Sequence, residues 1–472
     1  MYMYKRSIGG NRMKRFIGDR KFYKMVLTIA IPIMIQNGIT NFVGLLDNMM
    51  VGQMGTEQMT GVAIANQLMF VFNLCIFGGL SGAGIFGAQF YGQGDQNGVK
   101  YVFRFKLFIG ALITTLAFLI FSFLGENLIL NFLHDESTTG NIEACLSYGK
   151  QYLWVMMIGL IPFAATQIYT STLRETGETV LPMKAGLTAV LVNLCFNVIL
   201  IFGYLGFPAL GATGAAIATV ISRFVECAIV ISWTHRHADR NVYIQDAYHS
   251  LYVPKQLTNK ILLKGTPLML NEAAWASGMT VLMQSYSVRG LSVVAGLNIS
   301  ATISNLFNVV FIALGSSVSI IIGQLLGAGK MEEAKDTDTK LIFFSVASCV
   351  AIGLVLALTS PLFPRMYNTT DEVKELATYF ILISALCMPQ NAFMHATYFT
   401  LRSGGKTIIT FLFDSVYIWV LSIPLAYCLT RFTGLSIIPI YLICQMVDIV
   451  KCIIGYILVK KGVWLENITV SE

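Results

Sequence analysis

Apolar segments of twenty or more residues recur along the whole sequence and constrain its fold more than any other feature. A helix needs about 20 apolar residues to cross a bilayer, and twelve segments reach that length. The breaks between them carry glycine or charge-rich turn signals. The segments lie near residues 25–51, 61–85, 101–124, 152–173, 181–204, 211–234, 261–287, 292–322, 341–362, 376–400, 407–430 and 436–459. We therefore expect an all-α integral membrane protein with twelve transmembrane helices.

Composition supports this class and excludes others. Of the 472 residues, 55% are hydrophobic and 12% are charged, whereas soluble domains average about a quarter charged residues. A membrane β-barrel is excluded because its strands alternate in hydrophobicity over about ten residues. The nine cysteines lie mostly inside apolar runs, which indicates small buried side chains rather than disulfides or a structural metal site.

The basic residues are distributed unevenly between the loops. If the N-terminus and every second loop share one side, the other side receives only Lys150, Arg289, Arg365, Lys374 and Arg431. Loops rich in Lys and Arg stay in the cytoplasm, so we expect both termini to be cytoplasmic and the protein to lie in the plasma membrane. This placement also accounts for the net charge of +7, and we expect no nucleic-acid partner.

The longest cytoplasmic connection divides the chain into two sets of six spans. The predicted organisation is an N-terminal segment 1–24, an N-lobe 25–234, a linker 235–260, a C-lobe 261–459 and a C-terminal tail 460–472.

The two halves are internal repeats. A shift of 235 residues aligns the first half with the second without a gap from Pro32 to Gly94, and a shift of 228 aligns a later block. An even number of spans in each half makes this a parallel repeat, as in some transporters whose pathway lies between the halves. Matching residues include Pro32 with Pro267, Gln89 with Gln324, Gly92 with Gly327, and Thr172 with Thr400.

Asp47 is the most unusual residue of the first span. A carboxylate inside a membrane is unfavourable by roughly 2.5–3.5 kcal/mol, and such residues mark substrate or ion paths. Pro32, like Pro267 in the second half, predicts a helix bend. Asp47 aligns with Leu282 in the repeat, so the second half lacks this carboxylate. The alternative is a carboxylate solvated at the outer membrane edge.

The motifs together resemble the multidrug and toxic compound extrusion (MATE) family over nearly the whole chain. They are LLDNMMVGQMG in span one, GAQFYGQGD with its copy IGQLLGAGK, TLRETGET with its copy TLRSGGKT, GATGAAIATVISR in span six, and KKGVWLENIT near the end. The resemblance implies a cation-coupled exporter with two six-helix lobes around a V-shaped central cavity. It also implies exchange between outward-open and inward-open states.

The resemblance gives Asp47 the role of a coupling residue that binds H⁺ or, transiently, Na⁺. Hydroxyl and amide oxygens would complete such a site, and no structural metal or other cofactor is expected. Several family members have an aspartate where this chain has Asn197, so the N-lobe has one carboxylate fewer. The candidate partners are Gln36, Asn37, Asn193, Asn197 and Thr219.

The C-lobe offers a second group of candidates. Glu272 resembles a span-seven glutamate that other members carry about one turn further from the proline; a buried glutamate bonded to Asn271 is the alternative. Span ten has the neutral Gln390 and Asn391 where some members have an aspartate. Asp414 is either a cavity residue or an interfacial carboxylate answering Lys406 or Arg402. His395 could titrate near neutral pH or be a satisfied core residue.

Two pairs of opposite charge occur at i,i+3 spacing near the ends of the halves. Arg223 with Glu226 and Asp448 with Lys451 can each neutralise themselves on one helix face, which predicts structural ion pairs.

These features predict a cation-coupled antiporter that expels amphipathic, often cationic drugs and toxic organic compounds, and that works as a monomer in the bilayer. It is not expected to be an enzyme, since GQGDQNG lacks the phosphate-binding GxxxxGK[ST] pattern. The alternative is a flippase for a lipid-linked sugar, and a channel or receptor-like sensor is a further one. The mid-span charges are chiefly acidic, which favours cationic cargo.

Overall fold

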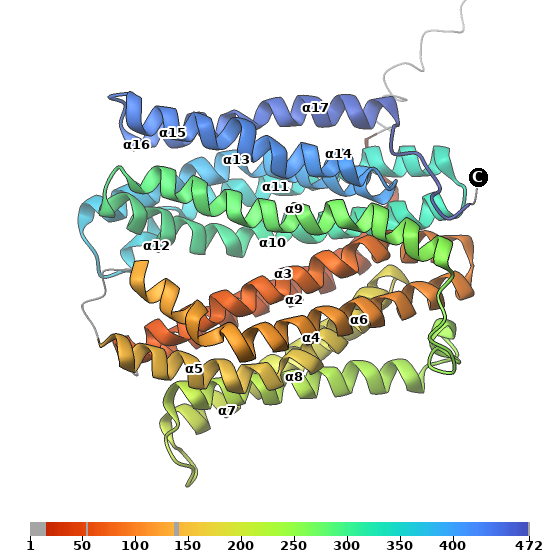
Figure 1. The fold of residues 1–472 in the computed structure, drawn as a ribbon. Coiled ribbons are helices and arrows are strands. Elements are labelled where there is room, and N and C mark those ends of the chain that lie inside the picture. Colours follow the sequence, from red (N-terminus) through yellow and green to blue (C-terminus); the bar gives the residue numbers. More distant parts are fainter. Residues whose placement is uncertain (1–15, 53–54, 136–140, 471–472) are drawn as a thin grey trace, which may run out of the picture. The chain divides into compact units, whose positions relative to one another are not determined.

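The computed structural model describes residues 16–52, 55–135 and 141–470, without the side chains of 45–49, 52, 56 and 132–135. Every regular element in this described part is helical (Figure 1). The elements are α2 Arg20–Gly52, α3 Thr56–Gln93, α4 Gln96–Asp135, α5 Ile142–Ile158, α6 Leu160–Glu175, α7 Val180–Phe202, α8 Gly211–Arg236, η1 Val242–Ile244, α9 Lys255–Ser287, α10 Leu291–Gly327, α11 Met331–Thr359, α12 Leu362–Arg365, α13 Asp371–Ser403, α14 Thr407–Phe411, η2 Leu412–Val416, η3 Ile418–Ser422, α15 Ile423–Phe432, α16 Ile437–Met446 and α17 Asp448–Lys461.

The helices cover the twelve segments expected to cross the membrane. Within the described residues, ten helical segments are long and apolar enough to do so, and α5 with α6, bent by 47° at Gly159, makes an eleventh. The seventh expected span is α9, which has 33 residues but carries the polar Asn271 and Glu272 and is less apolar than the others. The predicted all-α membrane class is confirmed.

The chain forms two compact units. Unit 1 contains Met1–Met34, Ala88–Asp95 and Thr266–Glu472, and unit 2 contains Ile35–Gly87 and Gln96–Gly265. Two of the chain's passages between units occur next to the repeated prolines. The passage after Met34 follows Pro32 in α2, and the passage after Gly265 precedes Pro267 in α9.

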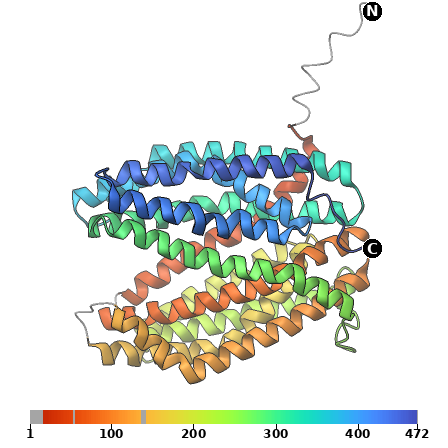
Figure 2. The same cartoon turned by 45° about the horizontal axis from the view of Figure 1, so that its top comes forward.

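The core of unit 1 includes the beginning of α2. Val26, Ala30 and Ile33 are buried against side chains of α10, α11 and α13. Helix α13 packs along both α10 and α11, and Figure 2 shows these helices running lengthwise beside one another. The start of the first helix is therefore held by the second half of the sequence.

The ends of α3 and α10 cross in unit 1 through a reciprocal contact of repeat copies, which we call the glycine crossing. A Cβ on Gly92 would lie 1.9 Å from the carbonyl oxygen of Gln324, and a Cβ on Gly327 would lie 1.9 Å from that of Gln89. Backbones approach this closely only where neither helix carries a side chain. The repeated glycines are thereby explained by packing.

The residues after α17 lie across the glycine crossing. The Gln89 side-chain amide donates to the carbonyls of Ser403 and Glu466, at 2.9 and 3.1 Å, and its oxygen accepts from the Ile468 backbone N–H at 2.8 Å. Trp464 is only 1% exposed. The KKGVWLENIT motif is thus a packed part of unit 1.

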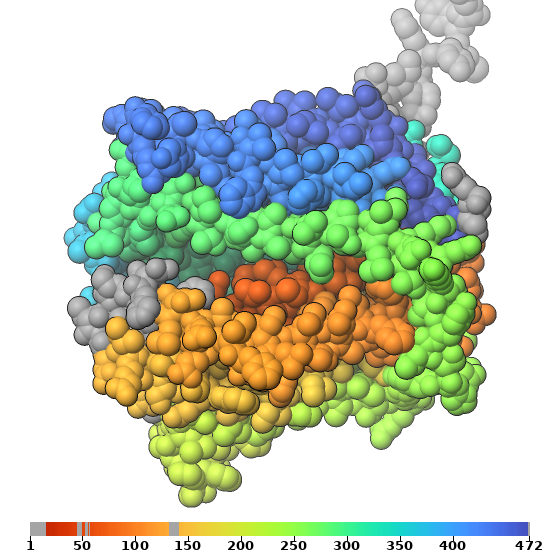
Figure 3. Space-filling model, viewed as in Figure 1, coloured from red at the N-terminus to blue at the C-terminus, as the bar shows by residue number. Residues whose placement is uncertain are grey.

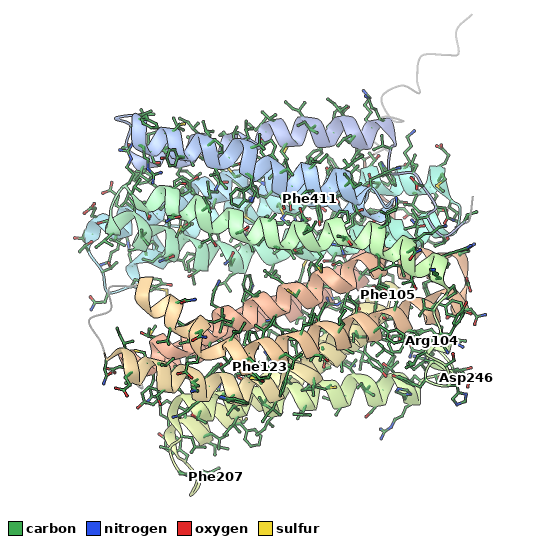
Figure 4. All side chains as sticks on the ribbon, viewed as in Figure 1. Arg104, Phe105, Phe123, Phe207, Asp246 and Phe411 are labelled. Atoms are coloured by element: carbon green, nitrogen blue, oxygen red, sulfur yellow. The ribbon has the colours of Figure 1, made fainter. Side chains whose placement is uncertain are left out.

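Unit 2 contains α4 to α8, with α8 packed against α5, α6 and α7. The connection after α8 folds against the same unit, as a compact mass in the space-filling view (Figure 3). Arg104 on α4 donates to the carbonyls of Asp246, Ala247 and Tyr252, at 2.9, 2.8 and 3.2 Å. Arg104 and Asp246 lie together in Figure 4. Burial raises the pKa of the Tyr243 hydroxyl in this connection.

Candidate functional site

A chain of hydrogen-bonded polar side chains joins α7 to α8 in unit 2. Asn197 donates to the Asn193 side-chain oxygen at 3.1 Å, and Asn193 donates to the Thr219 hydroxyl at 3.3 Å. The two asparagines are four residues apart, so they share one face of α7, and both are buried. The structure therefore brings together three of the predicted cation-site residues.

Thr219 also lines a cavity of about 320 Å³ in unit 2. This volume lies at the lower end of the range for small-molecule pockets. The Tyr152 hydroxyl donates to Asn66 at 3.2 Å, and the buried Asn73 side-chain oxygen has no hydrogen-bond partner among the described residues. The lining combines apolar, aromatic and amide groups: Gly44, Val51, Val62, Asn66, Met69, Phe70, Asn73, Tyr152, Met156, Ala215, Thr219 and Arg223.

Arg223 contributes the positive charge of this lining, and it does not form the predicted ion pair with Glu226. Its guanidinium donates to the Gly159 carbonyl at 3.3 Å and lies 4.9 Å from the centre of the Phe163 ring. Gly159 is the bend between α5 and α6, where a helix break frees a carbonyl to accept a hydrogen bond. The prediction of an Arg223–Glu226 pair is therefore corrected.

The remaining N-terminal candidates form no hydrogen bond with the asparagine chain among the described residues, or their side chains are not described. The Gln36 oxygen accepts from Arg174 at 2.5 Å. Glu226 and Gln36 both approach Gly186 of α7. Asn37 makes no side-chain hydrogen bond among the described residues. Asp47 falls in α2, and its side chain lies outside the described residues.

Unit 1 holds a charged network across α9, α13, η2 and α17. Lys451 donates to Asp414 at 2.7 Å, and Asn271 donates to the other Asp414 oxygen at 3.1 Å. Asn271 also donates to the Tyr398 hydroxyl at 3.4 Å and accepts from the Ser415 hydroxyl at 2.7 Å. Asp414 and Ser415 belong to a π-helical segment, a local distortion that is frequent at functional sites. Asp414 is thus the anion of a buried network.

The structure corrects the predicted partners of Lys451 and Asp414. Lys451 pairs with Asp414 rather than with Asp448, because α17 passes close to the π-helical turn. Lys406, one of the two partners in the alternative interpretation of Asp414, pairs with Glu466 of the C-terminal tail.

The other C-terminal candidates do not join this network by hydrogen bonds. Among the described residues, the Glu272 carboxylate makes no hydrogen bond or ion pair, although it neighbours Asn271 in sequence. Gln390 donates to the Gln445 carbonyl at 2.9 Å. No side-chain hydrogen bond is found for Asn391 in the described ranges, and His395 packs on the Phe311 ring at 4.7 Å.

Two buried ionisable groups were missed by sequence reasoning. Lys106 on α4 is 0% exposed and donates to both Glu175 oxygens at 2.7 Å, and to the hydroxyls of Ser171 and Thr172 at 3.1 Å. The second is Asp338 on α11, whose Oδ1 atom lies within hydrogen-bond distance of the Thr400 hydroxyl. The repeat of Thr172 and Thr400 was the only sequence feature that could have pointed to them. In the structure each of these threonines contacts one of the two buried groups.

Comparisons with known proteins agree with this architecture. The model of the MatE family matches residues 32–199 and 267–428. The two matches begin 235 residues apart, the same shift that aligns the halves. Two curated relatives are each described as a probable multidrug resistance protein NorM. That of Thermotoga maritima is 24% identical over 417 residues, covering 88% of this chain and 87% of its own. That of Halalkalibacterium halodurans is 25% identical over 422 residues, covering 88% of both.

The fold is also shared with a solved structure, described as an outward-facing conformation of a multidrug resistance MATE family transporter of the MOP superfamily. It is 18% identical, has a TM-score of 0.82, and the match covers 97% of this chain and 99% of that chain. The fold and the repeat define a multi-pass helical membrane protein built from two related halves. The chain belongs to the MatE family of transporters.

Proposed function

We propose that the protein is a cation-coupled antiporter that exports amphipathic, often cationic organic compounds. The family match over both halves carries this proposal, and relatives named as multidrug resistance proteins over 88% of the chain support it. We also propose that it lies in the plasma membrane with both termini in the cytoplasm, because the basic loops favour this orientation.

The cavity in unit 2 is the proposed place where cargo and coupling cation meet. It has Phe70 and Tyr152 for flat apolar groups and Met69 and Met156 as adaptable side chains, which suit varied ligands. Its polar groups are few and directed, as in other small-molecule sites.

We propose Asp47 as the coupling residue because of its spacing on α2. Gly44 and Val51 line the cavity, and position 47 follows the first by three residues and precedes the second by four. Residues at these spacings share one helix face. Thr219, the end of the asparagine chain, lines the same cavity as Gly44 and Val51.

The repeated prolines supply the proposed movement. Pro32 and Pro267 lie within three residues of points where the chain passes between the compact units. A proline removes one backbone hydrogen bond and weakens the helix locally, so α2 and α9 can bend there. Protonation of Asp47, or Na⁺ binding to it, would remove a charge from unit 2 and change the packing of α2 beyond this bend.

Efflux of ethidium from cells tests the proposal. Expression of the protein should lower cellular ethidium, and Asp47→Asn should abolish this effect while the protein remains in the membrane. Glu126→Gln is a matched control, because Glu126 is an exposed carboxylate paired with Lys150, and it should export normally. Efflux that persists in Asp47→Asn would remove Asp47 from the mechanism, and the absence of efflux by the unmodified protein would contradict drug export.

A further inference from the structure

Asp338 is a buried carboxylate that has no cationic partner in the part of the chain that the structure describes. It lies on α11 and is 1% exposed. Its Oδ1 atom is 2.5 Å from the Thr400 hydroxyl on α13, and its Oδ2 atom has no hydrogen-bond partner among the described residues. An ionised carboxylate buried with so few donors is unfavourable by several kcal/mol and becomes neutral instead.

The basic side chains on α11, on α13 and at the start of α2 form no ion pair with Asp338 in the described residues. On α11, Lys340 pairs with Asp336, and the exposed Lys335 makes no ion pair in the described residues. On α13, Arg402 lies over the Phe399 ring. On α2, Lys24 is exposed. No described Lys, Arg or His nitrogen forms an ion pair with Asp338.

A protonated Asp338 lets the Thr400 hydroxyl make both of its short contacts as hydrogen bonds. The Thr400 hydroxyl is also 2.9 Å from the Ala396 carbonyl oxygen, and a hydroxyl has a single hydrogen to donate. With an ionised Asp338, two acceptors compete for that hydrogen. With a protonated Asp338, the acid donates to the Thr400 oxygen, and Thr400 donates to Ala396.

The repeat supports this reading independently. Thr172, the copy of Thr400, contacts Lys106, whose charge is balanced by Glu175. The same shift of 228 places Ser403 at the position of Glu175. The second half therefore keeps the threonine beside an ionisable residue, Asp338, and has the uncharged Ser403 at the position of Glu175.

We propose that Asp338 is a proton-binding site that holds a proton at neutral pH in unit 1. The bound proton completes the hydrogen bonds between α11 and α13. Its release would leave an unpaired charge between these helices and loosen their packing, so proton occupancy at Asp338 controls how tightly α11 and α13 are held together.

Infrared spectroscopy of the purified protein in lipid at pH 7 tests the protonation state directly. The spectrum of the wild type minus that of Asp338→Asn should contain the C=O stretching band of a protonated carboxylic acid. Asp414→Asn is the control, because Asp414 is paired with Lys451 and should yield a carboxylate band. A carboxylate band in the Asp338 difference would overturn the proposal.

A milder variant covers the case in which Asp338→Asn does not fold. Thr400→Val removes the acceptor of the acid proton, so the same C=O band should persist and move to higher frequency. A band that does not move would show that Thr400 is not its partner and would contradict the assignment.

The pH dependence of unfolding gives a second readout. The folded wild type keeps a proton that the unfolded chain releases above about pH 4. Its stability relative to Asp338→Asn should therefore fall as pH rises, by about tenfold in the folding equilibrium per pH unit between pH 5 and 7. A difference that is flat or rises with pH would refute the site, and stabilisation of the wild type alone by Na⁺ would show a metal-cation site instead.

Discussion

Thr172 and Thr400 occupy the same position in the two repeats, but the charges beside them differ. Thr172 contacts Lys106, which is neutralised by Glu175, whereas Thr400 contacts Asp338, which has no counter-charge among the described residues. The hydroxyl belongs to the repeated scaffold, while the ionisable groups have diverged. The two units also differ elsewhere, since unit 2 has a neutral asparagine chain and unit 1 has the Asp414–Lys451 ion pair. The two halves therefore share their helical framework, and they differ in the positions of their ionisable residues.

The largest expected effect comes from breaking the pair beside Thr172. Glu175→Gln leaves Lys106 buried without an anion, and loss of one partner of a buried pair destabilises by about 3–5 kcal/mol. Thermal unfolding in detergent should show this loss. The control Glu126→Gln breaks an exposed pair and should change stability by only about 0–1 kcal/mol. Equal effects from the two variants would mean that burial of Lys106 has no energetic role.

Breaking the network in unit 1 should have a smaller effect. Asp414→Asn removes the anion of Lys451, but the Asp414 side chain is 22% exposed, so solvent screens part of the remaining charge. We expect Asp414→Asn to lower the free energy of unfolding by less than Glu175→Gln does. Adding Lys451→Met should restore part of that stability. If the double variant is no more stable than Asp414→Asn, the two side chains are not energetically coupled.

Substitutions at the glycine crossing test whether the two halves are also alike in packing energy. Gly92→Ala and Gly327→Ala each place a Cβ against the opposite backbone, and overpacking of this kind destabilises by about 1–3 kcal/mol. Because the contacts are reciprocal, the two variants should shift the unfolding midpoint similarly. Gly434→Ala, where a Cβ meets nothing within 4 Å, is the control. A large difference between Gly92→Ala and Gly327→Ala would show that the crossing is not symmetric in energy.

Much of the framework could be predicted from the sequence, because membrane spans and repeats leave long patterns. Apolar length located all twelve helices, and the shift of 235 was matched by the two family segments. The resemblance named Asn193 and Asn197 as candidates, and the structure joins them by a hydrogen bond.

The ion pairs could not be predicted in the same way, because their partners come from distant segments. Spacing of i,i+3 suggested Asp448 for Lys451, but α17 lies against the π-helical turn that carries Asp414, 37 residues away in sequence. The burial of Lys106 was hidden for the same reason, since its partner Glu175 lies on α6. Local sequence patterns predict helices well, but they do not predict which helix faces pack against each other.

Transport in proteoliposomes tests the central proposal most directly. Purified wild type and Asp47→Asn would be reconstituted, and ethidium movement followed under an imposed Na⁺ gradient, an imposed pH gradient, and neither. We predict that one gradient drives transport by the wild type and that neither drives transport by Asp47→Asn. Ethidium transport that is unaffected by both gradients, or that Asp47→Asn carries out as well as the wild type, would contradict a cation-coupled exporter that works through Asp47.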